Sequence, residues 1–154
     1  MERFAPILRG IAEKVGLESV KDCLKQPSIK AIYRITLHYQ DYRATSSVAT
    51  LTHATSADVL LEVNYQNKFE NKPLTRKLTP KAYENFTNDL ATLRFDKLKD
   101  QDVSPYGKDI CMVERGSGGF VHSVIFAPTE ADGDYEALFQ AIKTYLPEAL
   151  REIK

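Results

Sequence analysis

Three features are absent or scarce in this sequence: it has no tryptophan, only two cysteines, and no apolar run approaching the roughly 18 residues of a membrane-spanning helix. Cys23 and Cys111 are too few for the disulfide framework of small secreted domains. The N-terminal segment becomes charged again at Arg9, which leaves no uninterrupted apolar stretch for a signal peptide. These absences predict a cytoplasmic protein with reduced thiols and no membrane partner.

The sequence also lacks an excess of charge of either sign. Lysine plus arginine and aspartate plus glutamate each number 21. Domains that bind nucleic acid usually carry a basic excess or a basic stripe, so the composition does not favour a nucleic-acid partner. A net charge of zero does little to oppose association, which favours another protein or a second copy of the chain, as in a homodimer.

The residues that are present fit a single globular domain covering residues 1–154. Hydrophobic residues make up 43% of the chain, charged residues 27%, and eight tyrosines and seven phenylalanines can supply a core. A chain of this length buries enough surface to fold without disulfides or metals. We find no internal repeat, low-complexity segment or linker that would divide it.

The spacing of apolar residues predicts a helix near each end of the chain and one in the middle. It also predicts a short second helical stretch with Val20, Cys23 and Leu24, which Pro27 ends. Thr79 and Pro80 are typical of a helix start, with Thr79 as the cap and Pro80 in the first turn. Asp134 is predicted to cap the last helix, and Pro147 either to kink it or to restart it as a final turn. The N-terminal helix has a stripe of five apolar residues: Phe4, Ile7, Leu8, Ile11 and Val15.

Alternation with a period of two predicts the strands. From residue 31 one face of a strand carries four apolar residues and the other carries Arg34 and His38, which predicts a half-buried antiparallel strand with one wet face. The four are Tyr33, Ile35, Leu37 and Tyr39. Further strands are expected at 47–53, 59–65, a short edge at 74–78, and 109–114 and 120–126 around a glycine-rich turn at 115–119.

These elements define an α+β fold. The expected order is α-β-β-β-(β)-α-β-β-α, with an antiparallel sheet of five to six strands packed by three helices. This order resembles the plan of type III secretion chaperones and related small binding domains. The resemblance implies a chaperone-like role in binding other proteins.

The sequence offers one candidate for nucleophilic catalysis. Pairing Arg115 with Phe120 across the turn would make Cys111 and His122 diagonal neighbours on one face. The surrounding residues are apolar, no third group orients the histidine, and core packing is the favoured interpretation. Ligand pairs with zinc spacing and a phosphate-binding loop are both missing. We therefore predict no catalytic, cofactor-binding or metal-binding residues.

The last predicted hairpin is apolar on both faces, although helices of a two-layer domain cover only one. The second face would be covered by the first helix, by a second copy or by a partner. We predict an interface through Ile110, Met112, Val121 and Ile125. A basic docking patch is predicted at Lys68, Lys72, Arg76, Lys77 and Lys81.

The favoured function is therefore a non-enzymatic protein-binding module, such as an adaptor, a chaperone-like protein or an assembly factor. A small-ligand carrier with a cavity between sheet and helices is one alternative. A small cysteine- or histidine-dependent enzyme is another.

Overall fold

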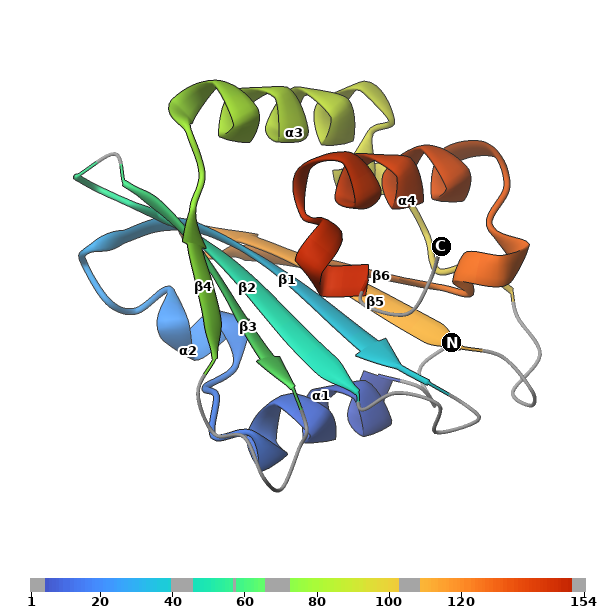
Figure 1. Cartoon of the computed structure of the whole chain (residues 1–154), viewed down its shortest axis with the longest axis horizontal. Helices are drawn as coiled ribbons and strands as arrows, with labels where there is room; N and C mark the ends of the chain where they lie inside the picture. Colours follow the sequence, from blue (N-terminus) through green and yellow to red (C-terminus); the bar gives the residue numbers. More distant parts are fainter. Residues whose placement is uncertain (1–4, 40–45, 57, 66–72, 103–108, 151–154) are drawn as a thin grey trace.

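A computed structural model of the chain describes residues 5–39, 46–56, 58–65, 73–102 and 109–150. Its centre is a six-stranded antiparallel sheet in the order β4-β3-β2-β1-β5-β6 (Figure 1). The strands are β1 (Ile29–His38), β2 (Ser47–Ala54), β3 (Val59–Tyr65), β4 (Leu74–Lys77), β5 (Ile110–Ser117) and β6 (Phe120–Phe126). The predicted α+β class and antiparallel sheet are confirmed.

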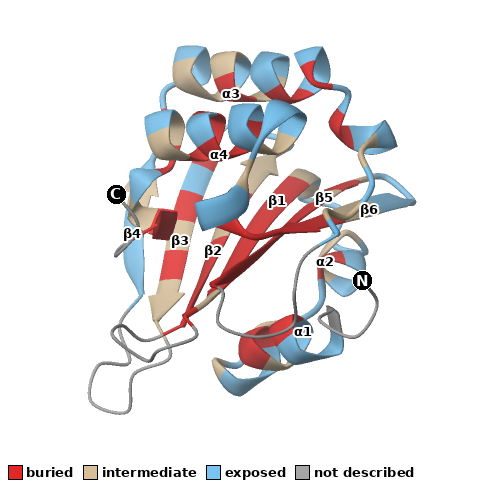
Figure 2. Ribbon diagram, turned by 90° about the vertical axis from the view of Figure 1, so that its right-hand side faces the viewer, coloured by how far each residue is buried: buried red, intermediate tan, exposed pale blue. Residues whose placement is uncertain are grey.

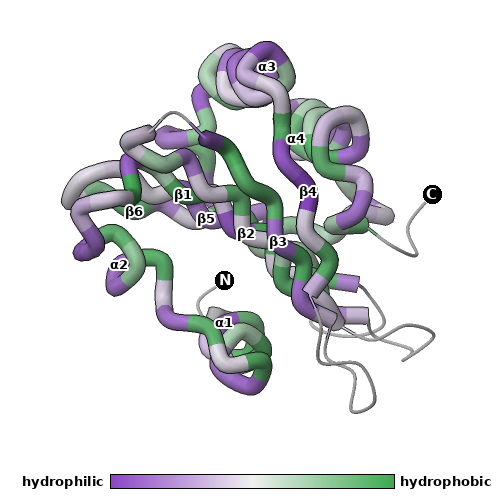
Figure 3. The backbone as a smooth tube through the Cα atoms, turned by 60° about the vertical axis from the view of Figure 1, so that its left-hand side comes forward, coloured by the Kyte–Doolittle hydropathy of each residue, from purple (hydrophilic) through white to green (hydrophobic). Residues whose placement is uncertain are grey.

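The helices lie on both faces of this sheet. They are α1 (Ala5–Lys14), α2 (Val20–Cys23), α3 (Pro80–Thr92) and α4 (Gly133–Tyr145), with short 3-10 turns η1 (Phe95–Lys97), η2 (Pro128–Glu130) and η3 (Pro147–Leu150). Three helices were expected to pack on the sheet; α2 is a fourth helix, and it lies where the short second helical stretch was predicted. Figure 3 shows α1 and α2 on the side of the sheet opposite α3 and α4. The domain therefore has three layers in its central part.

The main core lies between the sheet and the layer of α3, α4 and η3. The predicted apolar face of β1 enters it, because Tyr33, Ile35, Leu37 and Tyr39 are all at most 5% exposed. From the helices, Phe86, Leu138 and Ile142 are fully buried. Figure 2 shows buried residues concentrated in the central strands β1 and β5, whereas the edge strand β4 has none.

A second, smaller core lies under α1. Leu8 and Ile11 of α1 pack with Val48, Met112 and Ile125 of the sheet. The predicted helical stripe is only partly correct, since Ile7 is 57% exposed and faces away from the sheet. Phe4 lies outside the described residues.

The predicted wet face of β1 is wrong, because α1 and α2 cover it. Arg34 is 2% exposed. Its guanidinium donates to the carbonyl oxygen of Glu18 and to Oγ1 of Thr50. Glu114, opposite Arg34 on β5, is also buried, and burial raises the pKa of its carboxyl group while Arg34 and Arg9 oppose the shift. The buried charges of this face keep polar partners, since Arg34 has its two hydrogen bonds and Glu114 lies 3.9 Å from Nε of Arg9.

The start of α3 is as predicted. Oγ1 of Thr79 accepts a hydrogen bond from the backbone N–H of Ala82 at 3.1 Å, and Pro80 occupies the first turn. The predicted cap of α4 is wrong by two residues, since α4 begins at Gly133 after Asp132. Pro147 does restart the chain as the final turn η3.

The predicted register of the last hairpin is also wrong. Ser117 pairs with Phe120, Arg115 with His122 and Cys111 with Phe126. The turn therefore consists of Gly118 and Gly119 alone, and Gly118 has the positive φ of 59° that such a turn needs. Because β5 extends to Ser117, Arg115 is a strand residue on the same face as Cys111 and Val113.

Candidate functional site

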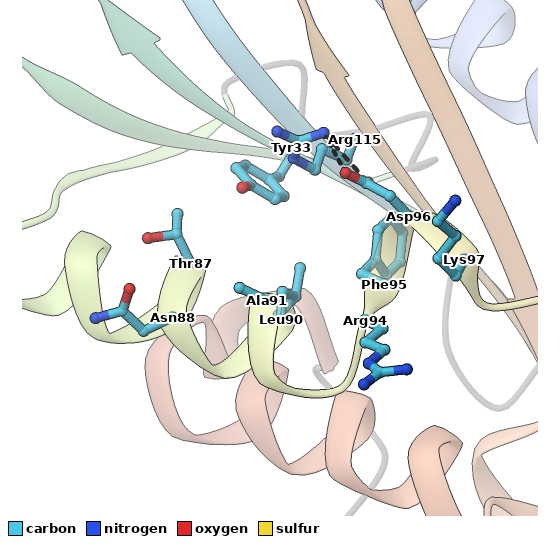
Figure 4. Close-up of a pocket in the computed structure, with 10 residues that line it drawn as sticks. All are labelled: Tyr33, Thr87, Asn88, Leu90, Ala91, Arg94, Phe95, Asp96, Lys97 and Arg115. Carbon is cyan, nitrogen blue, oxygen red and sulfur yellow. Dashed lines mark hydrogen bonds and ion pairs between the residues drawn. The ribbon is translucent and has the colours of Figure 1, made fainter.

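A cleft of about 450 Å³ lies between the sheet and the C-terminal end of α3 (Figure 4). Tyr33 of β1 and Arg115 of β5 form its sheet side. The opposite wall comes from α3 and η1: Thr87, Asn88, Leu90, Ala91, Arg94, Phe95, Asp96 and Lys97. We call this hollow the cationic cleft, because Arg94, Lys97 and Arg115 are cationic and Asp96 is its single carboxylate.

A sharp turn after α3 positions η1 against the hairpin. Arg94 has the left-handed backbone angle φ of 59°, and its N–H donates to the carbonyl oxygen of Ala91. Phe95 follows directly and is 2% exposed, with its ring edge-on to His122 at 5.5 Å between centroids. Burial of Phe95 therefore fixes Asp96 and Lys97 beside β5.

Arg115 is the centre of the cleft's interactions. Its Nη1 lies 2.9 Å and 3.2 Å from the two carboxylate oxygens of Asp96. Tyr33 is its partner across the paired strands β1 and β5, and its guanidinium lies 5.9 Å from the ring centroid of Phe120. Burial raises the pKa of Tyr33, and the neighbouring positive charge of Arg115 opposes that shift. The phenol therefore stays neutral at physiological pH.

A second hollow of about 390 Å³ continues the cleft towards the hairpin turn. It shares Asp96, Lys97 and Arg115 with the first and adds Ser117 and Phe120. Phe120 is 46% exposed and its neighbour Val121 is 37% exposed. The combined site thus joins cationic groups to an exposed aromatic ring.

Two of the three cations have no partner among the described residues. Arg94 and Lys97 make no ion pair and no side-chain hydrogen bond there, whereas Arg115 is paired with Asp96. In Figure 4 Lys97 lies beside Asp96, and Arg94 points away from Arg115 at the outer lip of the cleft. Three cations against one carboxylate leave the site positively charged in a chain whose net charge is zero.

The structure divides the four residues of the predicted interface. Ile110, Met112 and Ile125 are at most 3% exposed and belong to the smaller core under α1. This is the arrangement in which the first helix of the same chain covers the face. Val121 remains accessible at the end of the hairpin, next to Phe120.

The basic docking patch is not brought together as one described surface. Lys68 and Lys72 lie outside the described residues. Arg76 binds both carboxylate oxygens of Glu148 and donates to the carbonyl oxygen of Tyr145, which ties β4 to η3. Lys77 and Lys81 are exposed.

The candidate catalytic pair is not assembled. Cys111 and His122 are separated by four positions along the paired strands, about 13 Å at the usual rise of 3.3 Å per residue. Cys111 is fully buried, and burial raises the pKa of its thiol. His122 donates from Nε2 to the carbonyl oxygen of Leu98 at 2.8 Å.

Among the described residues, no group of three or more His, Cys, Asp or Glu side chains is arranged to hold a metal ion. The described helices include none that is both long and apolar enough to cross a membrane. A comparison with protein-family models and with the sequences of curated proteins gave no match to the chain.

The residues of the cationic cleft were not predicted from the sequence. Arg115 was assigned to a glycine-rich turn and so was not placed on a strand face. The available signal was the alternation of Cys111, Val113 and Arg115, which continues with a period of two past the predicted strand end. Nothing local predicts that η1 would lie against this strand.

Proposed function

We propose that this chain is a non-enzymatic, cytoplasmic protein-binding module, and that the cationic cleft with Phe120 is its docking site. The observation that carries the proposal is one hollow that combines Arg115, the exposed ring of Phe120, and Lys97, which has no ion pair among the described residues. Exposed arginine and aromatic side chains are enriched where proteins bind one another. Both described cysteines are free thiols, which supports a reducing compartment.

The partner chemistry follows from the charge of the cleft. Its cations outnumber its carboxylate by three to one, so an acidic segment of another protein is complementary and a basic one is repelled. The exposed face of Phe120 suits an apolar side chain next to the acidic residues. We therefore propose an acidic segment with an apolar anchor, and a second copy of the chain would be detected as an alternative outcome.

A selection of displayed random peptides on the immobilised full chain tests this function. We expect enriched peptides to be acidic and to contain an aromatic or large aliphatic residue. Their binding should be lost in the variants Lys97→Glu and Phe120→Ser, which alter exposed or partly exposed side chains and should leave the fold intact by circular dichroism. The exposed Lys81→Glu is the matched control, because it makes the same charge change on α3 outside the cleft. Selected peptides that bind all three variants equally well would contradict the docking site.

The volume of the cleft favours a small-ligand carrier as the second candidate. Small-molecule sites commonly have about 300–1,000 Å³, and this cleft of about 450 Å³ lies between the sheet and a helix. Native mass spectrometry of the purified protein separates the two functions. A retained small molecule that is lost in Lys97→Glu supports the carrier. A protein that retains no small molecule and binds the selected peptides supports the protein-binding function.

A further inference from the structure

We propose that Arg115 binds a carboxylate of the partner. In the free protein Asp96 occupies the same position on Arg115, as an internal stand-in for that carboxylate. The inference rests on the proposed docking function and names the regulation of the same site. It assigns opposite roles to two residues that form one ion pair. Arg115 would strengthen binding of an acidic segment, and Asp96 would compete with it.

The geometry of the pair is that of a bound carboxylate. Both oxygens of Asp96 lie within 3.2 Å of Nη1 of Arg115. Arginine is the side chain best suited to carboxylates, because its planar guanidinium presents several N–H donors. An incoming aspartate or glutamate could therefore replace Asp96 at the same donor without a change in chemistry.

The pair is exposed enough to exchange. The side chain of Arg115 is 28% exposed and that of Asp96 is 43% exposed. Ion pairs in contact with solvent contribute little to stability, because water competes for both charges and salt screens them. Breaking the ion pair between Asp96 and Arg115 would therefore cost little free energy when the partner binds.

Arg115 would keep its position without Asp96. It extends from the paired strand β5 directly opposite Tyr33 of β1, and its guanidinium lies over the ring of Phe120. Tyr33 is itself 5% exposed and packs edge-on against Phe86 at 5.3 Å, so it is a fixed support. A donor held in place by such supports binds its ligand with less loss of conformational freedom.

Lys97 supplies a second charge where the partner's carboxylate would enter. It lies next to Asp96 on η1, lines both hollows, and has no ion pair among the described residues. A carboxylate that displaces Asp96 would thus meet two cations. The released Asp96 side chain is already partly exposed and would turn to solvent.

A double-mutant cycle with a defined acidic probe tests the inference. The probe is a fluorescein-labelled Glu-Glu-Phe-Glu-Glu peptide, titrated at low salt with the full chain and followed by anisotropy. We expect Asp96→Asn to tighten binding about two- to fivefold, the factor that an exposed ion pair is worth. Arg115→Gln should weaken binding about tenfold or more, because a charge-assisted hydrogen bond is lost. In the Arg115→Gln background, Asp96→Asn should give no gain.

Two controls separate the stand-in role from a general effect of charge. Asp89→Asn removes the same negative charge from an exposed position of α3 outside the cleft, and it should leave the affinity unchanged. The peptide Gln-Gln-Phe-Gln-Gln should bind weakly to every variant. An equal gain from Asp96→Asn with and without Arg115 would overturn the inference, and so would a probe that binds no variant.

The outcome also distinguishes this inference from the proposed function. Selected peptides that need Lys97 and Phe120 but ignore Asp96→Asn would leave the docking function standing and overturn the stand-in role. If the mutant cycle gives the predicted affinities but the peptide selection fails, the role of Asp96 stands and the docking function is overturned. The cleft would then be an anion site without a protein partner.

Discussion

Replacing Arg94 by glycine should stabilise the protein, although the substitution removes a whole side chain. Arg94 has φ and ψ of 59° and 53°, and it is the one residue other than glycine with positive φ in the described part of the chain. A side chain in this left-handed region costs about 1–2 kcal/mol, and glycine is the usual residue at this position after a helix. The Arg94 side chain makes no ion pair or hydrogen bond within the described residues, so the variant loses little in return.

The greater freedom of glycine in the unfolded chain opposes part of this gain, by about 0.5–1 kcal/mol. The net increase in the free energy of unfolding should therefore be about 0.5–1 kcal/mol. For a chain of this size that corresponds to a rise of about 1–4 °C in melting temperature. Chemical denaturation and calorimetry would both detect it.

Arg94→Ala is the matched control for this prediction. Alanine removes the same charge and most of the same atoms but keeps a Cβ, so the backbone strain remains and no comparable gain is expected. A midpoint for Arg94→Gly that is unchanged or lower than that of the wild type would refute the reasoning. Strain at the lip of the cleft is consistent with the pattern that functional sites are not optimised for stability.

Four further predictions concern the cap of α3 and three buried side chains. Thr79→Ala should lower the unfolding free energy by about 1 kcal/mol through loss of the α3 cap, and an unchanged denaturation midpoint would contradict this. Ile125→Asp should unfold the domain by circular dichroism, because it places an unpaired charge under α1; a folded monomer would instead show that this side chain is accessible. In an alkylation time course on folded protein, Cys111 should react more slowly than the partly exposed Cys23, and faster reaction at Cys111 would disprove its burial. Glu114→Gln should gain stability relative to the wild type as pH rises above 4.5, since the raised folded-state pKa of Glu114 makes its ionisation unfavourable in the fold; parallel stability curves would exclude this.

The sequence predicted the elements better than their ends. Period-two alternation located β1 and its apolar face because one side of that strand enters the main core. The extent of β5 was missed because Gly116 resembled part of a turn. A Cβ on Gly116 would come within 2.6 Å of Leu24 and 2.7 Å of Val20, so this glycine allows α2 to pack against the strand. Close packing between distant segments cannot be recognised from local spacing.

The candidate site was not predicted from the sequence. Of the four residues predicted for an interface, three are covered by α1, and the exposed Val121 lines neither hollow of the site. The sequence could not show that α1 covers this face, since an amphipathic helix fits any apolar surface. The cationic cleft escaped prediction for a similar reason, because Arg115 and Asp96 meet through the fold and lie 19 residues apart in sequence.

The most direct test of the docking site is a titration of the isotope-labelled full chain with the acidic Glu-Glu-Phe-Glu-Glu peptide, followed through its backbone amide resonances. The amides that shift should be those of residues 94–97 and 115–120, on the two sides of the cationic cleft. The Lys97→Glu variant should abolish these shifts. Shifts that cluster instead at Lys77 and Lys81, or at the strands under α1, would contradict the assignment of the cleft as the binding surface.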